Sequence, residues 1–198
     1  MGIIIVPAIA LYLLISVGVV VWAIKHAKKN GKSVKRWGWS AVLVMYLIPF
    51  WDWIPTVAVH QYYCATESGF WVYKTVDQWK AENPGVMETL VENKGEPHSS
   101  VGSYNSYLDT YFLNQRLNMV VKKQGSFFIH RWRYERVLID TKTNEALGRY
   151  VDFSTSQQRR QAGWSGWKFW LDNRHCIGGR GNAINSGNWI NQFKGTEK

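Results

Sequence analysis

Two long apolar stretches dominate the first third of the chain. Residues 3–24 form a run of 22 residues without a charged side chain, which at 1.5 Å per residue is long enough for a membrane-spanning helix. Residues 38–59 form a second apolar stretch that contains one acid, Asp52. From Cys64 onward the chain becomes polar, aromatic and basic. We therefore predict a two-helix membrane anchor over residues 1–63 and a separate domain over residues 64–198.

The first stretch also invites interpretation as a cleaved signal peptide. A signal peptide has basic residues before its apolar run and small residues at a cleavage site. Only Met1 and Gly2 precede this run, and no small-residue site precedes Lys25. The pattern favours a retained helix over residues 3–24.

The basic segment 25–37 sets the expected orientation. Short loops rich in Lys and Arg stay on the cytoplasmic side of a membrane. The same charges can contact anionic lipid headgroups, which is compatible with this orientation. We expect a bacterial inner-membrane protein with loop 25–37 in the cytoplasm and with the N-terminus and C-terminal domain in the periplasm. The segment holds six of the chain's 24 Lys and Arg residues: Lys25, Lys28, Lys29, Lys32, Lys35 and Arg36.

The second stretch carries aromatic residues at both ends, as expected where a helix crosses the two membrane interfaces. Pro49 and Pro55 bracket Asp52, so the helix either kinks there or ends near Phe50. The interface aromatics are Trp37 and Trp39 on the inner side and Trp51, Trp53, Tyr62 and Tyr63 on the outer side.

Residues 64–198 show the alternation of β-strands. Apolar and polar side chains alternate in three segments separated by short turns, which predicts an antiparallel meander. The segments are 113–121, 128–139 and 146–154. A further strand is expected at 70–76, helical turns at 77–82 and 86–92, and a loop at 93–106. The predicted fold class is thus two N-terminal transmembrane helices plus a small α+β domain.

The net charge of +10 does not point to nucleic acid. Six basic residues lie in segment 25–37, and residues 60–198 hold 18 basic and 13 acidic residues, a net of +5. Such a balance is typical of a mixed, solvated surface rather than of a phosphate-binding stripe. We expect no nucleic-acid partner.

The two cysteines, Cys64 and Cys176, lie near opposite ends of the domain. In an oxidising periplasm they would form a disulfide; the alternative is a pair of buried free thiols. No Cys-x-x-Cys motif indicates a redox-active pair.

Asp52 is the only acid in the apolar stretches, and an ionisable group within a membrane is a candidate functional residue. The first stretch offers Tyr12 and Ser16 but no opposite charge. Asp52 therefore either extends outward to the membrane surface, caps a helix or pairs with a basic residue of its own domain, or it contacts another membrane protein. Trp51, Asp52 and Trp53 are our candidate contact residues at this junction.

The tryptophan run Trp164, Trp167 and Trp170 has two interpretations. Together with nearby basic residues it could form an interfacial amphipathic helix. Alternatively, it closes an aromatic core of the small domain.

Catalytic motifs are weak. Residues 163–166 (GWSG) lack the final glycine of a nucleophile elbow, and residues 178–181 (GGRG) are no dinucleotide fingerprint. The five histidines are scattered without metal-ligand spacing. We expect no enzyme activity, no cofactor, no metal and no small-molecule substrate.

Four segments carry a resemblance to a group of small bacterial inner-membrane proteins with a periplasmic domain. They read IPFWDWIPTVAVHQYYC, SGFWVYKTV, RYERVLIDTKTNEALGRYVDF and WKFWLDNRHC, and they extend over about residues 45–176. The resemblance rests on an aspartate near the end of a spanning helix, a cysteine just past it and a late cysteine. It implies an anchored envelope protein and transfers no activity.

The function we expect is a non-catalytic accessory or interaction subunit of a larger bacterial membrane assembly. Its partners would be other membrane protein subunits and the lipid bilayer. The alternatives are a standalone envelope protein of the exclusion or immunity type and a membrane-tethered enzyme.

Overall fold

The structure is a computed structural model, and it describes residues 2–93, 99–103, 106–126, 130–156, 171–172 and 175–195. The chain divides into two compact units, Met1–Pro55 and Thr56–Lys198.

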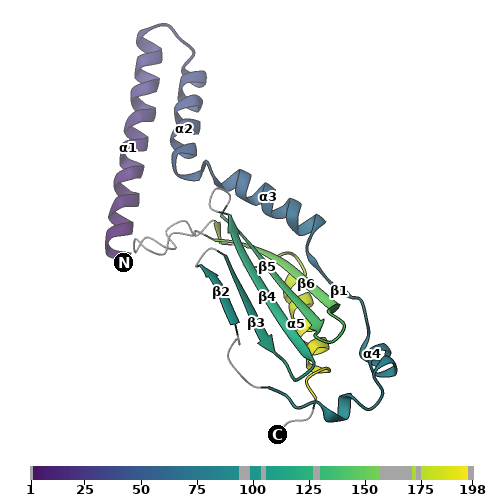
Figure 1. The fold of residues 1–198 in the computed structure, drawn as a ribbon. Helices are drawn as coiled ribbons and strands as arrows, with labels where there is room; N and C mark the ends of the chain where they lie inside the picture. The colour runs from purple at the N-terminus through teal and green to yellow at the C-terminus, as the bar shows by residue number, and fades with distance from the viewer. Residues whose placement is uncertain are drawn as a thin grey trace. The chain divides into compact units, whose positions relative to one another are not determined.

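The N-terminal unit is built on an antiparallel pair of helices, α1 (Gly2–Lys29) and α2 (Val34–Phe50) (Figure 1). Small residues allow the two helices to approach closely. Ala23 and Ala27 of α1 are buried, and a Cβ atom on Gly38 of α2 would lie 3.5 Å from the Ile24 side chain. The hydroxyl of Tyr12 donates a hydrogen bond to the carbonyl of Met45. Helix α1 ends at Lys29 and α2 begins at Val34, so most of the predicted loop 25–37 is helical.

The outer surfaces of this helix pair are apolar. Exposed large apolar side chains line both helices, among them Val6, Leu11, Leu14 and Val17 of α1 and Leu43, Val44 and Ile48 of α2. Within the described residues, one helix, α1, is long and apolar enough to cross a membrane, a test that a signal sequence also passes. Helix α2 alone does not meet this length criterion. It meets it only when it is joined to the next helix across the turn at Trp51 and Asp52.

Helix α3 (Trp53–Thr66) begins in the N-terminal unit and continues into the C-terminal one. The second apolar helix therefore ends at Phe50, one of the two outcomes the sequence left open. Pro55 lies in the first turn of α3, where a missing N–H costs little. The expected span end at Val59 and domain start at Cys64 both fall inside α3.

The C-terminal unit is an α+β domain with a six-stranded antiparallel sheet in the order β1-β6-β5-β4-β3-β2, which confirms the α+β class and the meander predicted for this domain. Strands β4, β5 and β6 form its long centre (Figure 1). The strands are β1 (Gly69–Val72), β2 (Ser99–Ser103), β3 (Ser106–Phe112), β4 (Leu117–Ser126), β5 (Arg131–Asp140) and β6 (Glu145–Thr155). The helical elements are α4 (Val76–Glu82), the 3-10 turn η1 (Met87–Thr89) and α5 (Gly179–Asn191).

One expectation for this domain was wrong, and one helix was not predicted at all. The predicted loop 93–106 contains β2, whose Ser- and Gly-rich sequence has no apolar alternation and which gains its order by pairing with β3. The Gly- and Asn-rich run after Cys176 forms helix α5 despite its low helix propensity. The burial of Ile190, and of Phe193 just beyond the end of α5, compensates for this low helix propensity. Tertiary packing supplies most of a helix's stability in a protein.

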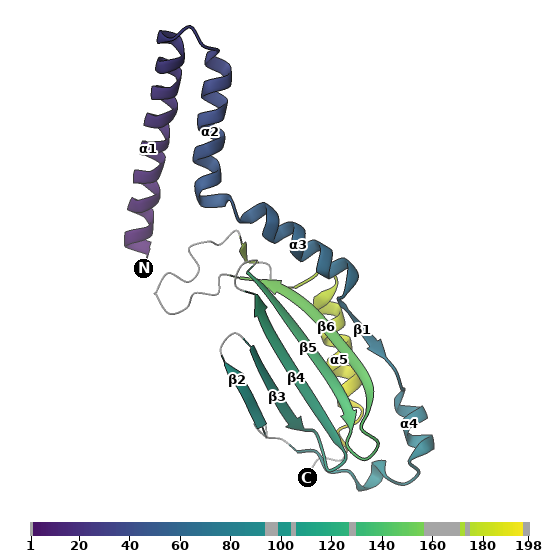
Figure 2. The same ribbon diagram turned by 45° about the horizontal axis from the view of Figure 1, so that its top comes forward.

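The core lies between the sheet and α5, which runs along one sheet face in both views (Figures 1 and 2). Its centre is Trp79 of α4, which is 1% exposed and packs edge-to-face against Phe193 at a ring distance of 5.9 Å. The strands contribute Leu117, Leu138 and Leu147 to the same cluster.

One ion pair is built into this core. Asp140 accepts hydrogen bonds from Arg116 at 2.6 and 3.0 Å and from the indole N–H of Trp79 at 2.9 Å. Burial raises the pKa of Asp140, but the hydrogen bonds from Arg116, Trp79 and the Lys142 backbone, with the charge of Arg116, hold that pKa below its ordinary value. The pair ties the start of β4 to the end of β5.

Candidate functional site

The C-terminal unit contains two candidate sites, a polar cluster around a disulfide and a pocket beside the sheet edge. The disulfide joins Cys64 of α3 to Cys176, just before α5, with a Cα–Cα distance of 5.4 Å. This is the pair that the sequence predicted. Their separation of 112 residues means that the bond closes most of the domain into one loop.

Asp152 of β6 is the centre of the polar cluster and is 4% exposed. Its Oδ1 accepts hydrogen bonds from the backbone N–H groups of Cys176, at 3.1 Å, and Phe153, at 2.9 Å. Its Oδ2 accepts from the Tyr150 hydroxyl at 3.0 Å and lies 2.6 Å from Nδ1 of His175. Burial, with the charge and hydrogen bond of Asp152, strongly raises the pKa of Tyr150. Asp152 thus holds the segment that carries Cys176 against the sheet.

His60 of α3 packs against the disulfide. Its two ring nitrogens lie 3.8 and 3.6 Å from Sγ of Cys64, and burial lowers its pKa, an effect that the charge of Asp152 and the backbone of His175 partly oppose. His60 and the two cysteines place three potential metal-ligand atoms within 4.8 Å of one another. In the disulfide, however, neither sulfur is a thiolate, the form that binds metal. The oxidised cluster is therefore not a metal centre.

The pairing of His175 with Asp152 resembles half of a catalytic triad, since a buried carboxylate orients a partly exposed imidazole. A triad also needs a nucleophile in hydrogen-bond contact with the imidazole. Within the described residues, His175 makes a side-chain hydrogen bond only with Asp152. The pair of His175 and Asp152 is therefore a structural support, because Asp152 holds the segment that carries the disulfide residue Cys176.

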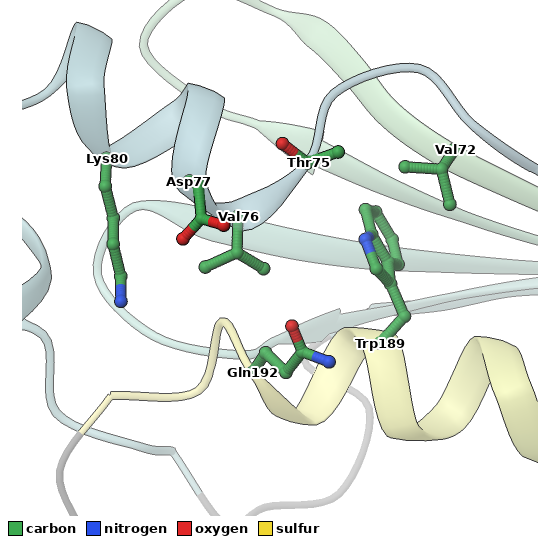
Figure 3. Close-up of a pocket in the computed structure, with 7 residues that line it drawn as sticks. All are labelled: Val72, Thr75, Val76, Asp77, Lys80, Trp189 and Gln192. Carbon is green, nitrogen blue, oxygen red and sulfur yellow. The ribbon is translucent and has the colours of Figure 1, made fainter.

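The second candidate site is a pocket of about 540 Å³ beside the edge of the sheet. It lies between β1, α4 and α5 (Figure 3). The Thr75 hydroxyl and the Gln78 side chain form a capping box that fixes the start of α4 at this pocket. The lining residues are Val72, Thr75, Val76, Asp77, Lys80, Trp189 and Gln192.

Trp189 is the largest side chain in the pocket. Its ring lies against Phe70 of β1 and Phe193, with centroid distances of 5.7 and 5.0 Å. Its Nε1 atom is buried and has no hydrogen-bond acceptor among the described residues. Figure 3 shows the indole at the end of the pocket near Val72, with Lys80 at the opposite end. A buried N–H without an acceptor is costly, so this atom marks a place for a missing acceptor.

The strand next to the pocket, β1, is an outer strand of the sheet. The backbone N–H of Tyr73, just past its end, donates to the carbonyl of Leu147 in β6. Because successive residues of a strand direct their amide groups to opposite sides, the amide of Val72 points away from the sheet. Trp71, Val72 and Tyr73 are 39%, 41% and 55% exposed. The pocket is therefore continuous with an open strand edge and an exposed apolar rim.

The other candidate residues from the sequence lie outside these two sites. Trp51 and Asp52 form the turn between α2 and α3, and Trp53 begins α3. Asp52 is 2% exposed, whereas Trp51 and Trp53 are 63% and 39% exposed. All three belong to the N-terminal unit. The run Trp164, Trp167 and Trp170 lies outside the described residues.

Sequence reasoning missed the partners of the disulfide and the pocket tryptophan. One signal was available, because the alternation in residues 146–154 places Tyr150 and Asp152 on one face of a strand. His175 also stands next to Cys176 in the sequence. For Trp189 no local signal existed, since its role depends on a helix that the sequence did not predict.

Comparison with known proteins gives no further guidance: no protein-family model, curated protein or solved structure matches this chain.

Proposed function

We propose that this protein is a membrane-anchored, non-catalytic interaction subunit of a larger membrane assembly. The observation that carries the proposal is the pocket beside β1, where, within the part of the chain that the structure describes, a buried indole N–H without an acceptor lies next to an unpaired sheet edge. Catalytic sites gather several titratable groups, whereas among the described residues that line this pocket the ionisable ones are Asp77 and Lys80. An unsatisfied donor and an open edge suit a binding site for another chain.

The apolar surface of helices α1 and α2 supports the anchor. In water, exposed aliphatic side chains such as Leu14, at 72%, and Val17, at 63%, would cost about 25 cal/mol per Å² of apolar area. A lipid bilayer removes that cost. In this proposal α1 and α2 cross the membrane, and α3 leads out of it into the domain.

The orientation follows from two chemical arguments. The basic residues at the connection of α1 and α2 favour the cytoplasm for that end of the helix pair. The Cys64–Cys176 disulfide favours an oxidising compartment for the domain. Together they support a bacterial inner-membrane protein with a periplasmic domain.

The anchor and its orientation are tested by fusion to the C-terminus. An alkaline phosphatase fusion should be active and should stay in the membrane after carbonate extraction. A fusion with cytoplasmic β-galactosidase at the same position serves as the matched control and should be inactive. The reverse pattern would contradict the proposed orientation, and release of the chain by carbonate would contradict the anchor.

The interaction role is tested by purification from membranes in mild detergent. The full chain should copurify with a second membrane protein in a fixed ratio. A chain that is always recovered alone would contradict this role.

A further inference from the structure

We propose that the pocket binds an extended strand of the partner protein, which pairs with β1 and places one apolar side chain next to Trp189. The inference rests on the proposed function, because it specifies how the interaction subunit holds its partner. Three features of the domain support it.

The first feature is the open backbone edge of β1. Among the described residues, Gly69 to Val72 pair with β6 on one side only, and β1 is the outermost strand of the sheet. Natural sheets protect such edges with Lys, Pro or bulges, whereas GFWV contains no charge and no proline. The amides on the outer side of β1 can pair with an added strand, as in other strand-addition complexes.

The second feature is the direction in which an added strand would point its side chains. Residues directly opposite each other in paired strands share one face of the sheet. Val72 lies on the face that carries Trp189, because it is opposite Gly148, against which the indole packs. A residue of the partner opposite Val72 would therefore direct its side chain toward the pocket. A pocket of about 540 Å³ is within the usual range for ligand sites.

The third feature is the hydrogen-bonding requirement of the pocket. The buried Nε1–H of Trp189 lacks an acceptor among the described residues, and a peptide carbonyl would supply one. Most of the pocket's contact surface is apolar, provided by Val72, Val76 and the indole ring. An extended peptide with a large apolar side chain satisfies both the donor and the apolar lining.

The test uses the full chain in detergent and an unbiased displayed library of short linear peptides as the probe. We expect selected peptides to alternate apolar and polar residues. Each selected peptide is then synthesised with single N-methyl groups along its backbone. Methylation of every second amide, those facing β1, should weaken binding about tenfold, because it removes a backbone hydrogen bond and blocks the approach of the strand. The intervening positions should change little.

Two matched variants locate the site. Trp189→Phe removes the indole N–H and should weaken binding about fivefold through loss of a hydrogen bond. Trp39→Phe is the control, because Trp39 is an exposed tryptophan of α2 in the N-terminal unit and does not line the pocket, so binding should be unaffected. Thermal unfolding of both variants shows whether the fold is retained.

The outcomes separate this inference from the proposed function. The inference is overturned if no peptide is selected, if N-methylation shows no alternation, or if Trp39→Phe weakens binding as much as Trp189→Phe. A dimer of the chain that is lost in Trp189→Phe would also overturn it, by assigning the edge to a second copy. If a partner still copurifies in any of these cases, the interaction subunit stands and only its mode of binding is wrong. If peptides bind as expected but no partner copurifies, the role as an assembly subunit fails.

Discussion

The indole ring of Trp189 packs against Gly148 of β6. A Cβ atom at position 148 would lie 2.6 Å from the ring, closer than real Cβ contacts allow, and 3.1 Å from the carbonyl oxygen of Trp71. The absence of a side chain at Gly148 is therefore what allows α5 to bring its tryptophan to the sheet edge. The pocket depends on this contact.

Substitution Gly148→Ala should displace Trp189 and destabilise the domain by about 1–3 kcal/mol, the usual cost of overpacking. Chemical unfolding followed by tryptophan fluorescence measures both effects. Gly187→Ala is the control, because Gly187 lies within α5 with no atom within 4 Å of an added Cβ. It should stabilise the helix by up to about 1 kcal/mol. Equal destabilisation by both variants would contradict the proposed contact.

The disulfide should contribute a large part of the stability of the domain. A loop closed over 112 residues corresponds to about 4–5 kcal/mol in the chain-entropy model. The double substitution of Cys64 and Cys176 by Ser should lower the midpoint of thermal unfolding by about 10 °C or more. Adding a reductant should lower the midpoint of the native chain and leave that of the double variant unchanged. A native chain that is insensitive to reductant would argue against the bond.

Asp152 and His175 should differ in importance although they touch. Asp152→Ala leaves the buried N–H groups of Cys176 and Phe153 without the acceptor they share, while the Tyr150 hydroxyl keeps the carbonyl of Gly179, and the change should cost about 3 kcal/mol. His175 is 48% exposed in its side chain, and His175→Ala should cost under about 1 kcal/mol. Urea unfolding of the two variants compares them. Equal costs would mean that His175 has a role beyond supporting Asp152.

The ion pair of Asp140 and Arg116 should make the domain sensitive to acid. Because the folded state holds the pKa of Asp140 below its unfolded value, the charge stabilises the fold at higher pH. That contribution is lost as the pH falls from about 4 through the lower folded pKa. Asp140→Asn should remove this part of the acid dependence and destabilise the domain by about 3 kcal/mol at neutral pH, since Arg116 is left buried without its charge partner.

Unfolding free energies measured between pH 2 and 7 test this effect. Glu88→Gln is the control, because Glu88 is exposed on η1 and should leave the pH profile unchanged. An Asp140→Asn variant with the same acid dependence as the native chain would contradict the assignment.

The sequence was informative wherever local pattern and tertiary structure agree. The alternation in residues 128–139 and 146–154 predicted β5 and β6 almost to their ends, because both strands pair along nearly their whole length. Apolar length located α1, but the stretch 38–59 was predicted as one span, where the structure has α2 ending at Phe50 and α3 beginning at Trp53. Cys64 and Cys176 could be paired because they are the only two cysteines.

The rest could not be predicted because it depends on contacts between distant residues. Strand β2 has no apolar alternation and is ordered by its pairing with β3. Helix α5 has a Gly- and Asn-rich sequence and depends on the burial of Ile190 and Phe193. The pocket combines Val72 with Trp189, which lie 117 positions apart, so no local motif could indicate it.

The central proposal is that this chain acts as an anchored subunit bound to a partner. Native mass spectrometry of the full chain, extracted in mild detergent from the membranes in which it is naturally expressed, tests that claim directly. We predict a complex of fixed stoichiometry with a second membrane protein. A chain that is recovered only as a monomer, with no second protein bound, would contradict it.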